Sequence, residues 1–294
     1  MPTPTGVVDI AGDSLTHCAV LSTGRVMCWG WGEQGQLGDG IASAGHASSE
    51  PVEVAGLDDA VAVAVSASMS HVCAVRKNGA VACWGRNEGT LGFDSPQCGP
   101  YPRQISDTEF VDDFFPCETK PRDIPGVSGA ATIAIGTSYQ CAVSADGVAT
   151  CWGAFGTIDG GLQMPVQPPA PLKAMGAVKQ ISVGFDHSCA LLEDARVACW
   201  GDNKYGQLGL GPGSGVEASP DPLLVPGIDK AVSLTASSGL TCTPRASGKI
   251  TCWGAVTSIV RRVEDFDGQR SSGSWPASQR LMSTRGARSR SVLS

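Results

Sequence analysis

The stretch CAVLSTGRVMCWG, which runs from Cys18 to Gly30, recurs in four further copies along this 294-residue chain. The copies are CAVRKNGAVACWG from Cys73, CAVSADGVATCWG from Cys141, CALLEDARVACWG from Cys189 and CTPRASGKITCWG from Cys242. In every copy the two cysteines lie ten positions apart, and Trp-Gly follows the second one. The copies begin 55, 68, 48 and 53 residues after one another, so each repeating unit has room for about four short strands.

The first copy fits a β-hairpin that is closed by a three-residue loop. If Cys18 faces Cys28, then Leu21 faces Arg25, and Ser22-Thr23-Gly24 remains as the loop. Loops of this kind end in a residue with left-handed backbone geometry, which glycine adopts without a Cβ penalty. Glycine also holds this position at Gly79, Gly147 and Gly248. The fourth copy has Ala195 there, so we expect a strained turn or a different turn type.

The hairpin register places the two cysteines of each copy in a non-hydrogen-bonded pair, with Cα atoms about 4.5 Å apart. A disulfide can span that distance. The expected bonds are Cys18-Cys28, Cys73-Cys83, Cys141-Cys151, Cys189-Cys199 and Cys242-Cys252. Each closes a loop of about 11 residues, which stabilises the folded chain by roughly 3 kcal/mol in the chain-entropy model. A helical protein with similarly spaced cysteines is the first alternative, and the glycines at the turn positions disfavour it. A zinc site is the second, and the absence of closely spaced ligands disfavours it.

Two further features of the unit indicate packing between neighbouring sheets. A tryptophan follows each second cysteine and therefore faces the opposite side of its strand, and we expect it in the core. An alternating segment precedes each hairpin, as in AVAVAVSAS before Cys73, and indicates one more strand per unit. His71 and His187 stand two residues before a first cysteine, but other copies carry Tyr139 and Leu240 there, so packing is the expected role.

Charge, hydropathy and cysteine content limit the classes of function and the compartment. Residues 1–260 carry 14 Lys and Arg against 25 Asp and Glu, so this acidic part is not expected to bind nucleic acid. No stretch of apolar residues is long enough to span a membrane, so no transmembrane segment is expected, and the N-terminal residues show no signal peptide. Twelve cysteines in regular pairs nevertheless favour an oxidising compartment, which predicts an extracellular, cell-surface or periplasmic protein.

The loop after the Cys-Trp-Gly tripeptide connects the unit to a known family. The first copy continues with Gly35-Gln36-Leu37-Gly38, and the fourth with Gly206-Gln207-Leu208-Gly209. Together with the strand, the hairpin and Trp-Gly, this loop resembles a repeat of the regulator-of-chromosome-condensation family. The resemblance covers roughly residues 7–254. It implies an all-β fold, a β-propeller in which each repeat supplies the strands of one blade, usually with seven blades around a central axis.

This chain departs from the family pattern in several ways. Five recognisable repeats fall short of seven, so the ring is open, incomplete or completed by divergent segments. Copy two has Gly89-Thr90-Leu91-Gly92, and copies three and five lack the Gly-Gln-Leu-Gly loop. The cysteine pairs resemble a branch found in secreted bacterial proteins and plant receptor ectodomains. We therefore do not transfer nucleotide exchange or chromatin binding to this chain.

The propeller repeat domain is expected to occupy residues 1–260, with an unusual insertion at residues 97–118 between the second and third hairpins. Cys98 and Cys117 form a sixth pair there and enclose the aromatic residues Tyr101, Phe110, Phe114 and Phe115. Aromatic side chains on a pinned loop provide contact area at little entropic cost, which makes these four candidate partner-binding residues. The alternative is that they form a small core beneath the loop. Residues 261–294 form a basic Ser/Arg-rich tail for which we expect disorder, or a truncated or frame-shifted end.

The sequence favours a non-catalytic binding or scaffold protein that engages a protein or a glycan through blade loops. No catalytic, cofactor or metal site is predicted, because the Gly30–Gly35 match to G-x-G-x-x-G opens no helix. The first alternative is a propeller enzyme, a lyase or a glycosidase, with carboxylates that converge from different blades. The second alternative is an intracellular exchange-factor-like or nucleic-acid-binding propeller.

Overall fold

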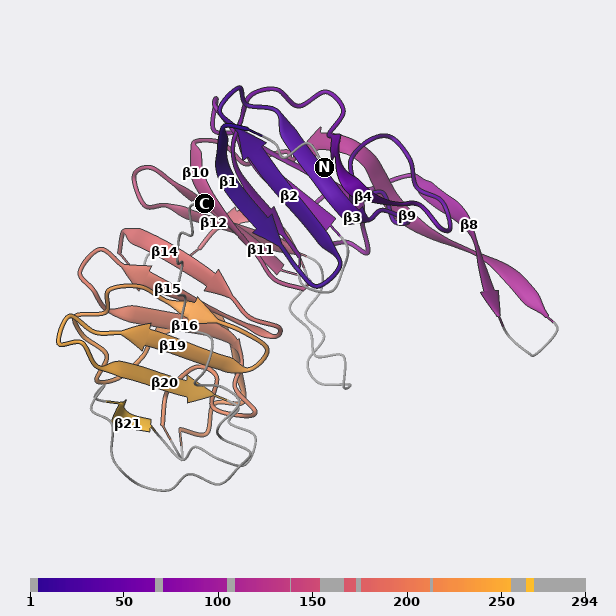
Figure 1. Ribbon diagram of the computed structural model, residues 1–294. Helices are drawn as coiled ribbons and strands as arrows, with labels where there is room; N and C mark the ends of the chain where they lie inside the picture. The colour runs from indigo at the N-terminus through magenta and orange to yellow at the C-terminus, as the bar shows by residue number, and fades with distance from the viewer. Residues whose placement is uncertain are drawn as a thin grey trace, which may run out of the picture.

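The computed structural model describes residues 5–66, 71–104, 109–137, 139–153, 167–172, 176–211, 214–254 and 263–266. This part of the chain forms β-strands and turns, arranged as five antiparallel sheets that follow one another as propeller blades. The sheets form an arc, and the first and the fifth blade lie at its two ends (Figure 1). None of the described residues belongs to a helix that is long and apolar enough to cross a membrane.

Four of the five blades have four strands in sequence order. Blade 1 contains β1 (Val7–Gly12), β2 (Thr16–Leu21), β3 (Val26–Trp31) and β4 (Ala47–Glu53). Blade 3 contains β10 (Ala130–Ile135), β11 (Tyr139–Ser144), β12 (Ala149–Gly153) and β13 (Gln167–Pro171). Blade 4 contains β14 (Val178–Val183), β15 (His187–Leu192), β16 (Val197–Asp202) and β17 (Ala218–Leu224). Blade 5 contains β18 (Thr235–Ala236), β19 (Leu240–Pro244), β20 (Ile250–Gly254) and β21 (Val263–Phe266).

Blade 2 has a fifth strand, in the order β5-β6-β7-β9-β8. Its strands are β5 (Ala60–Val65), β6 (His71–Arg76), β7 (Val81–Arg86), β8 (Gln97–Gln104) and β9 (Phe110–Asp123). β8 and β9 extend well beyond the other strands of the blade (Figure 1). The predicted insertion at residues 97–118 is therefore a two-stranded arm and not an irregular loop.

The hairpins have the predicted register. In blade 1, Cys18 faces Cys28 and Val20 faces Val26, and Leu21 closes the turn by donating its N–H to the Arg25 carbonyl at 2.8 Å. The same pairing of cysteines recurs in the other four hairpins. All five hairpin pairs are disulfides with Cα–Cα distances of 4.0 or 4.1 Å, and Cys98 pairs with Cys117.

The third loop residue has the expected left-handed backbone in every hairpin. Gly24 has a φ of 89° and Gly248 a φ of 83°. Ala195 also adopts this conformation, with a φ of 66°. Of the two alternatives for the fourth copy, the structure therefore has the strained one, a turn of the same shape that carries a Cβ atom.

Neighbouring blades pack face to face, and each blade uses its two faces differently. We call the face that carries the hairpin disulfide the forward face, and the face that carries the tryptophan the rear face. The forward face of blade 1, with Cys18 and Val26, packs against the rear face of blade 2, with Val63 and Trp84. The next three interfaces repeat this arrangement. The hairpin disulfides of blades 1 to 4 therefore lie between blades, where they extend the apolar core.

A backbone hydrogen bond joins each hairpin turn to the following blade. The Ala60 amide donates to the Gly24 carbonyl at 2.9 Å, and the Val178 amide donates to the Gly147 carbonyl at 2.9 Å. Ala130 and Ala231 make the equivalent bonds to Gly79 and Ala195, at 2.9 and 3.1 Å. The approach is close enough that a Cβ atom on Gly24 would lie 2.2 Å from the Asp58 carbonyl oxygen.

The Gly-Gln-Leu-Gly loops make a second connection between blades. The Trp84 indole N–H donates to the Gln36 carbonyl at 3.0 Å, and the Trp253 indole N–H donates to the Gln207 carbonyl at 2.9 Å. Leu37 in the first of these loops is completely buried. Trp84, Trp152 and Trp200 are completely buried, which confirms the predicted packing role for these three, whereas Trp29 and Trp253 are only partly buried.

Blade 5 has an outer strand beyond residue 260. β21 pairs with β20, so that Ile250 faces Phe266 and Cys252 faces Val263. β21, at residues 263–266, thus supplies the outer strand of blade 5 from within the segment 261–294 that the sequence predicts as the tail. The expectation of disorder for residues 267–294 concerns residues outside the described part of the structure.

Candidate binding arm on blade 2

The arm is formed by β8 and the first half of β9. Within β9, residues from Cys117 onward pair with β7 and complete blade 2, whereas Phe110 to Pro116 pair with β8. One strand therefore belongs to both the blade and the arm, which ties the direction of the arm to that of the blade. Gly99 allows the close approach of the two strands, because a Cβ atom there would lie 2.8 Å from the Asp113 carbonyl oxygen.

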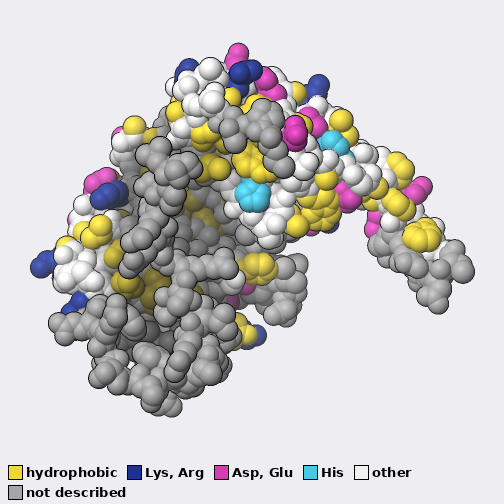
Figure 2. Space-filling model, viewed as in Figure 1, with side chains coloured by type: hydrophobic (Ala, Val, Ile, Leu, Met, Phe, Trp, Pro, Cys, Tyr) yellow, Lys and Arg dark blue, Asp and Glu magenta, His cyan; other side chains and the backbone are white. Residues whose placement is uncertain are grey.

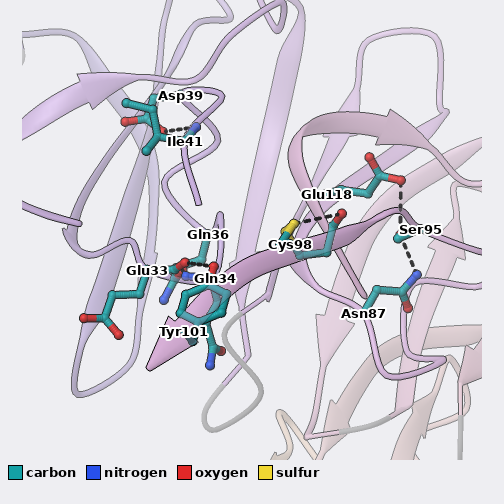
Figure 3. Close-up of a disulfide and its surroundings, with 11 residues drawn as sticks. Glu33, Gln34, Gln36, Asp39, Ile41, Asn87, Ser95, Cys98, Tyr101 and Glu118 are labelled. Atoms are coloured by element: carbon teal, nitrogen blue, oxygen red, sulfur yellow. Dashed lines mark hydrogen bonds between the residues drawn. A yellow bond between two sulfur atoms is a disulfide. The ribbon is translucent and has the colours of Figure 1, made fainter. Parts of the chain in front are cut away.

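Polar contacts and a disulfide hold the base of the arm. Cys98 on β8 is bonded to Cys117, which is fully buried. Ser95 donates to the Glu118 carboxylate at 3.1 Å and accepts from the Asn87 side chain at 2.7 Å (Figure 3). Asn87 also accepts the Leu91 amide at 3.0 Å. This network connects the base of the arm to the loop of the second repeat.

Two of the four predicted aromatic residues pack inward. Tyr101 and Phe115 are stacked with ring centroids 4.4 Å apart, and the Arg86 guanidinium lies 4.9 Å from the Phe115 centroid. The Tyr101 hydroxyl donates to the Glu33 carbonyl of blade 1, towards which it points in Figure 3. Burial, assisted by the negative charge of Glu33, raises the pKa of Tyr101. This pair therefore fastens the arm to blades 1 and 2.

The other two aromatic residues face solvent. Phe110 is 60% exposed and Phe114 is 57% exposed. They lie four positions apart on β9, so both project from the same side of the strand, with Asp112 exposed between them. The rise of a strand puts them about 13 Å apart. Residues Phe110, Asp112 and Phe114 form what we call the outer strip of the arm.

The structure therefore separates the four candidate contact residues into two pairs. Tyr101 and Phe115 correspond to the alternative of a small core, whereas Phe110 and Phe114 are free for contacts. Asp112, which lies between them on β9, also belongs to the outer strip. The alternation Phe-x-Asp-x-Phe in residues 110–114 is the sequence signal for this arrangement once the segment is known to be a strand.

The outer edge of the arm is protected against strand addition. β8 is the edge strand of its sheet, and it contains Pro100 and Pro102. Proline has no amide hydrogen, so these positions cannot donate to an added strand. The exposed side chains of β9, and not the β8 backbone, are the contact groups that this arm offers.

Buried titratable groups elsewhere in the described residues are isolated from one another. His71 in blade 2 lies 2.8 Å from the Gln140 amide nitrogen, and His187 in blade 4 lies 2.7 Å from the Thr241 hydroxyl. Burial lowers the pKa of His187 to about 4. Both histidines connect neighbouring blades. Within the described ranges, no Asp or Glu is buried and no group of three metal-ligating side chains is found.

Comparison with known families agrees with the repeat pattern. Profiles described as regulator of chromosome condensation (RCC1) repeats match residues 7–36, 62–89 and 178–207, and a further one matches residues 23–75. The chain belongs to the RCC1 repeat family. The matched segments contain the hairpins of blades 1, 2 and 4, which carry the most complete repeat sequences.

Relatives of this RCC1 repeat chain include human and plant proteins. It is 32% identical over 239 residues to a protein described as probable E3 ubiquitin-protein ligase HERC6 from Homo sapiens, covering 77% of this chain and 21% of that protein. It is 32% identical over 123 residues to the ultraviolet-B receptor UVR8 of Arabidopsis thaliana, covering 42% of this chain and 24% of that protein. The chain thus spans about a quarter or less of the length of these relatives.

The fold is also similar to that of a solved structure. The crystal structure of human WBSCR16 matches with a TM-score of 0.64 and 19% sequence identity, covering 84% of this chain and 61% of that chain. At this level of identity the similarity concerns the fold alone. It agrees with the all-β propeller architecture that the repeats imply.

Proposed function

We propose that this protein is a non-catalytic binding module that engages a partner through the outer strip of the blade 2 arm. The observation that carries the proposal is the exposure of Phe110 and Phe114 on an arm whose base is fixed by a disulfide and by Tyr101. Large apolar side chains on a rigid element are typical of contact surfaces, because little conformational entropy is lost when they are covered.

The chemistry of the outer strip favours a protein over a glycan as the partner. Two phenyl rings flank a single carboxylate, Asp112, so the strip offers mainly apolar contact. A sugar requires several hydrogen-bonding groups around an aromatic platform, whereas a protein surface with two apolar pockets and a basic residue between them satisfies all three side chains. A glycan partner remains the second outcome of the test below.

We also propose that the protein acts outside the cytoplasm, at the cell surface, in the periplasm or in the extracellular space. All twelve cysteines lie in pairs at disulfide distance. Disulfides of this kind persist in oxidising compartments. Thiol titration of the unreduced protein from its native source tests the proposal, and twelve titratable thiols would contradict it.

The binding role is tested by substitution of the outer strip. The double variant Phe110→Ser/Phe114→Ser should lose capture of partners from native surface and secreted fractions, because it removes the two apolar contact groups and leaves the base of the arm unchanged. The matched control is Ile41→Ser/Val148→Ser, which removes two exposed aliphatic side chains from blades 1 and 3. Equal capture by the double variant and the wild-type chain would refute the role of the strip.

Enzymatic removal of glycans from the captured fraction distinguishes the two partner classes. Capture that persists after this treatment indicates a protein surface, and capture that disappears indicates a glycan. The enzyme alternative from the sequence requires convergent buried carboxylates or histidines. The two buried histidines lie in blades 2 and 4 and are bonded to Gln140 and Thr241, so the described residues give that alternative no support.

A further inference from the structure

The rear face of blade 1 exposes positions that the preceding blade covers elsewhere in the arc. Ile10 on β1 faces Ala19, in the same register as Val63 facing Ala74 in blade 2 and Ile181 facing Ala190 in blade 4. Val63 is 6% exposed and Ile181 is 7% exposed, but Ile10 is 62% exposed. The difference arises because blades 2 and 4 have a neighbour on this side and blade 1, in the described structure, has none.

Other residues of blade 1 show the same difference. Val7 is exposed, whereas Ala60 and Val178 at the equivalent positions are buried. Trp29 is partly exposed, whereas the equivalent Trp84, Trp152 and Trp200 are completely buried. Trp29 stacks on His17 at a centroid distance of 5.8 Å. Hydrophobic side chains are visible at the surface over blade 1 in Figure 2.

The forward face of blade 5 is exposed in the complementary way. Ile250 faces Pro244, in the same register as Val26 facing Val20 and Val197 facing Leu191. Val26 and Val197 are completely buried, but Ile250 is 43% exposed. The disulfide of blade 5 is also only partly buried. A Cβ atom on the turn residue Gly248 would meet no atom within 4 Å, in contrast to the crowding at Gly24.

The rear face of blade 1 has the donor, and the forward face of blade 5 the acceptor, of the backbone hydrogen bond that joins neighbouring blades. Between neighbouring blades within the arc, a backbone amide at or just before the first strand of one blade donates to the turn carbonyl of the preceding hairpin, as Ala60 does to Gly24. Val7 has the position of this donor in blade 1, and Gly248 has the position of the acceptor in blade 5. Val7 belongs to blade 1 and Gly248 to blade 5, the two ends of the arc (Figure 1), and no backbone hydrogen bond joins them in the described part of the chain.

We propose that the rear face of blade 1 binds the forward face of blade 5 of a second copy of this chain, head to tail. Every internal interface pairs a forward face with a rear face, and the described residues leave one further face of each kind uncovered. The contact would cover Val7, Ile10 and Trp29 on one copy and Ile250 on the other. Such a heterologous contact extends to chains of molecules or to a closed ring.

The test uses the complete 294-residue chain and two variants, Ile10→Asp and Ile250→Asp. Both substitutions are at exposed positions, so neither removes a buried contact within the monomer. In sedimentation velocity up to about 100 µM, which detects contacts with micromolar Kd, the wild-type chain should form concentration-dependent oligomers. Each variant alone should associate at least about tenfold more weakly, because a desolvated carboxylate would face an apolar surface. The control Val148→Asp, an exposed aliphatic position on blade 3, should assemble as the wild-type chain does.

An equimolar mixture of the two variants distinguishes this geometry from other contacts. Ile10→Asp retains an intact blade 5 face and Ile250→Asp an intact blade 1 face, so the mixture should form a heterodimer and no larger species. A wild-type chain that stays monomeric at the highest concentration overturns the proposal. Oligomers of Ile250→Asp that match those of the wild-type chain would show a contact between two rear faces, and they overturn it as well.

Discussion

Substitution of the turn glycines tests how much the contact between blades contributes to stability. Gly24 and Gly248 occupy the same hairpin position with nearly the same φ, 89° and 83°. Their surroundings differ, because a Cβ atom on Gly24 would lie 2.2 Å from the Asp58 carbonyl oxygen, whereas one on Gly248 would meet nothing within 4 Å. The pair therefore separates the backbone cost of alanine from the cost of losing the interface.

The expected magnitudes follow from these two environments. An alanine in the left-handed region costs roughly 1–2 kcal/mol, and Gly248→Ala should lose about that amount. Gly24→Ala carries the same cost and must also displace the backbone at Asp58, in the loop just before β5. This displacement breaks the 2.9 Å hydrogen bond from Ala60 to Gly24, whose loss adds about 1 kcal/mol before any apolar surface is exposed. We expect a total loss of about 3 kcal/mol or more for Gly24→Ala.

The measurement is denaturant unfolding of the unreduced protein, followed by tryptophan fluorescence, which reports on the rear faces. Ala195→Gly is the reverse substitution, and it should stabilise the chain by roughly 0.5–1 kcal/mol, because relief of the left-handed strain exceeds the entropy that glycine adds to the unfolded state. Equal losses for Gly24→Ala and Gly248→Ala would refute the reasoning, since the close approach between blades 1 and 2 would then contribute nothing.

Three further predictions concern two single side chains and the disulfide at the base of the arm. Burial lowers the pKa of His187 from 6.5 to about 4, so the unfolded state takes up a proton first as the pH falls. The free energy of unfolding should therefore decrease between pH 6.5 and 4, by up to about 3 kcal/mol, and His187→Gln should remove this component from a series of denaturation curves. Trp84→Phe removes the indole donor to Gln36 and should cost about 1–3 kcal/mol in the same assay; an unchanged midpoint would contradict the role of this bond. Replacing Cys98 and Cys117 by alanine should speed proteolysis within residues 97–118 and leave the Cys18–Cys28 hairpin protected; uniform cleavage of both would show that the arm is not an independent unit.

The local structure of each repeat could be predicted from the sequence because its determinants lie within 13 residues. The spacing of Cys18 and Cys28 and the glycine at position 24 define a register, and that register places the cysteines opposite each other without reference to the rest of the chain. The tryptophan then faces the other side of the strand by alternation alone. The family resemblance, carried by the Gly35–Gly38 loop, added the propeller architecture that spacing does not supply.

The tertiary structure decided which side chains remain free for contacts, because exposure depends on neighbours that are distant in the sequence. Tyr101 and Phe115 are held by Glu33 and Arg86, from blade 1 and from another strand of blade 2, whereas Phe110 and Phe114 have no such cover and stay exposed. The sequence also left open the shape of the turn at Ala195. In the structure this residue has the left-handed backbone, and its carbonyl accepts the hydrogen bond from the Ala231 amide of the next blade. Ile10 and Val63 have the same position in the alternating pattern of their strands. Val63 is buried because blade 1 packs on it, whereas Ile10 is exposed because no described blade covers it.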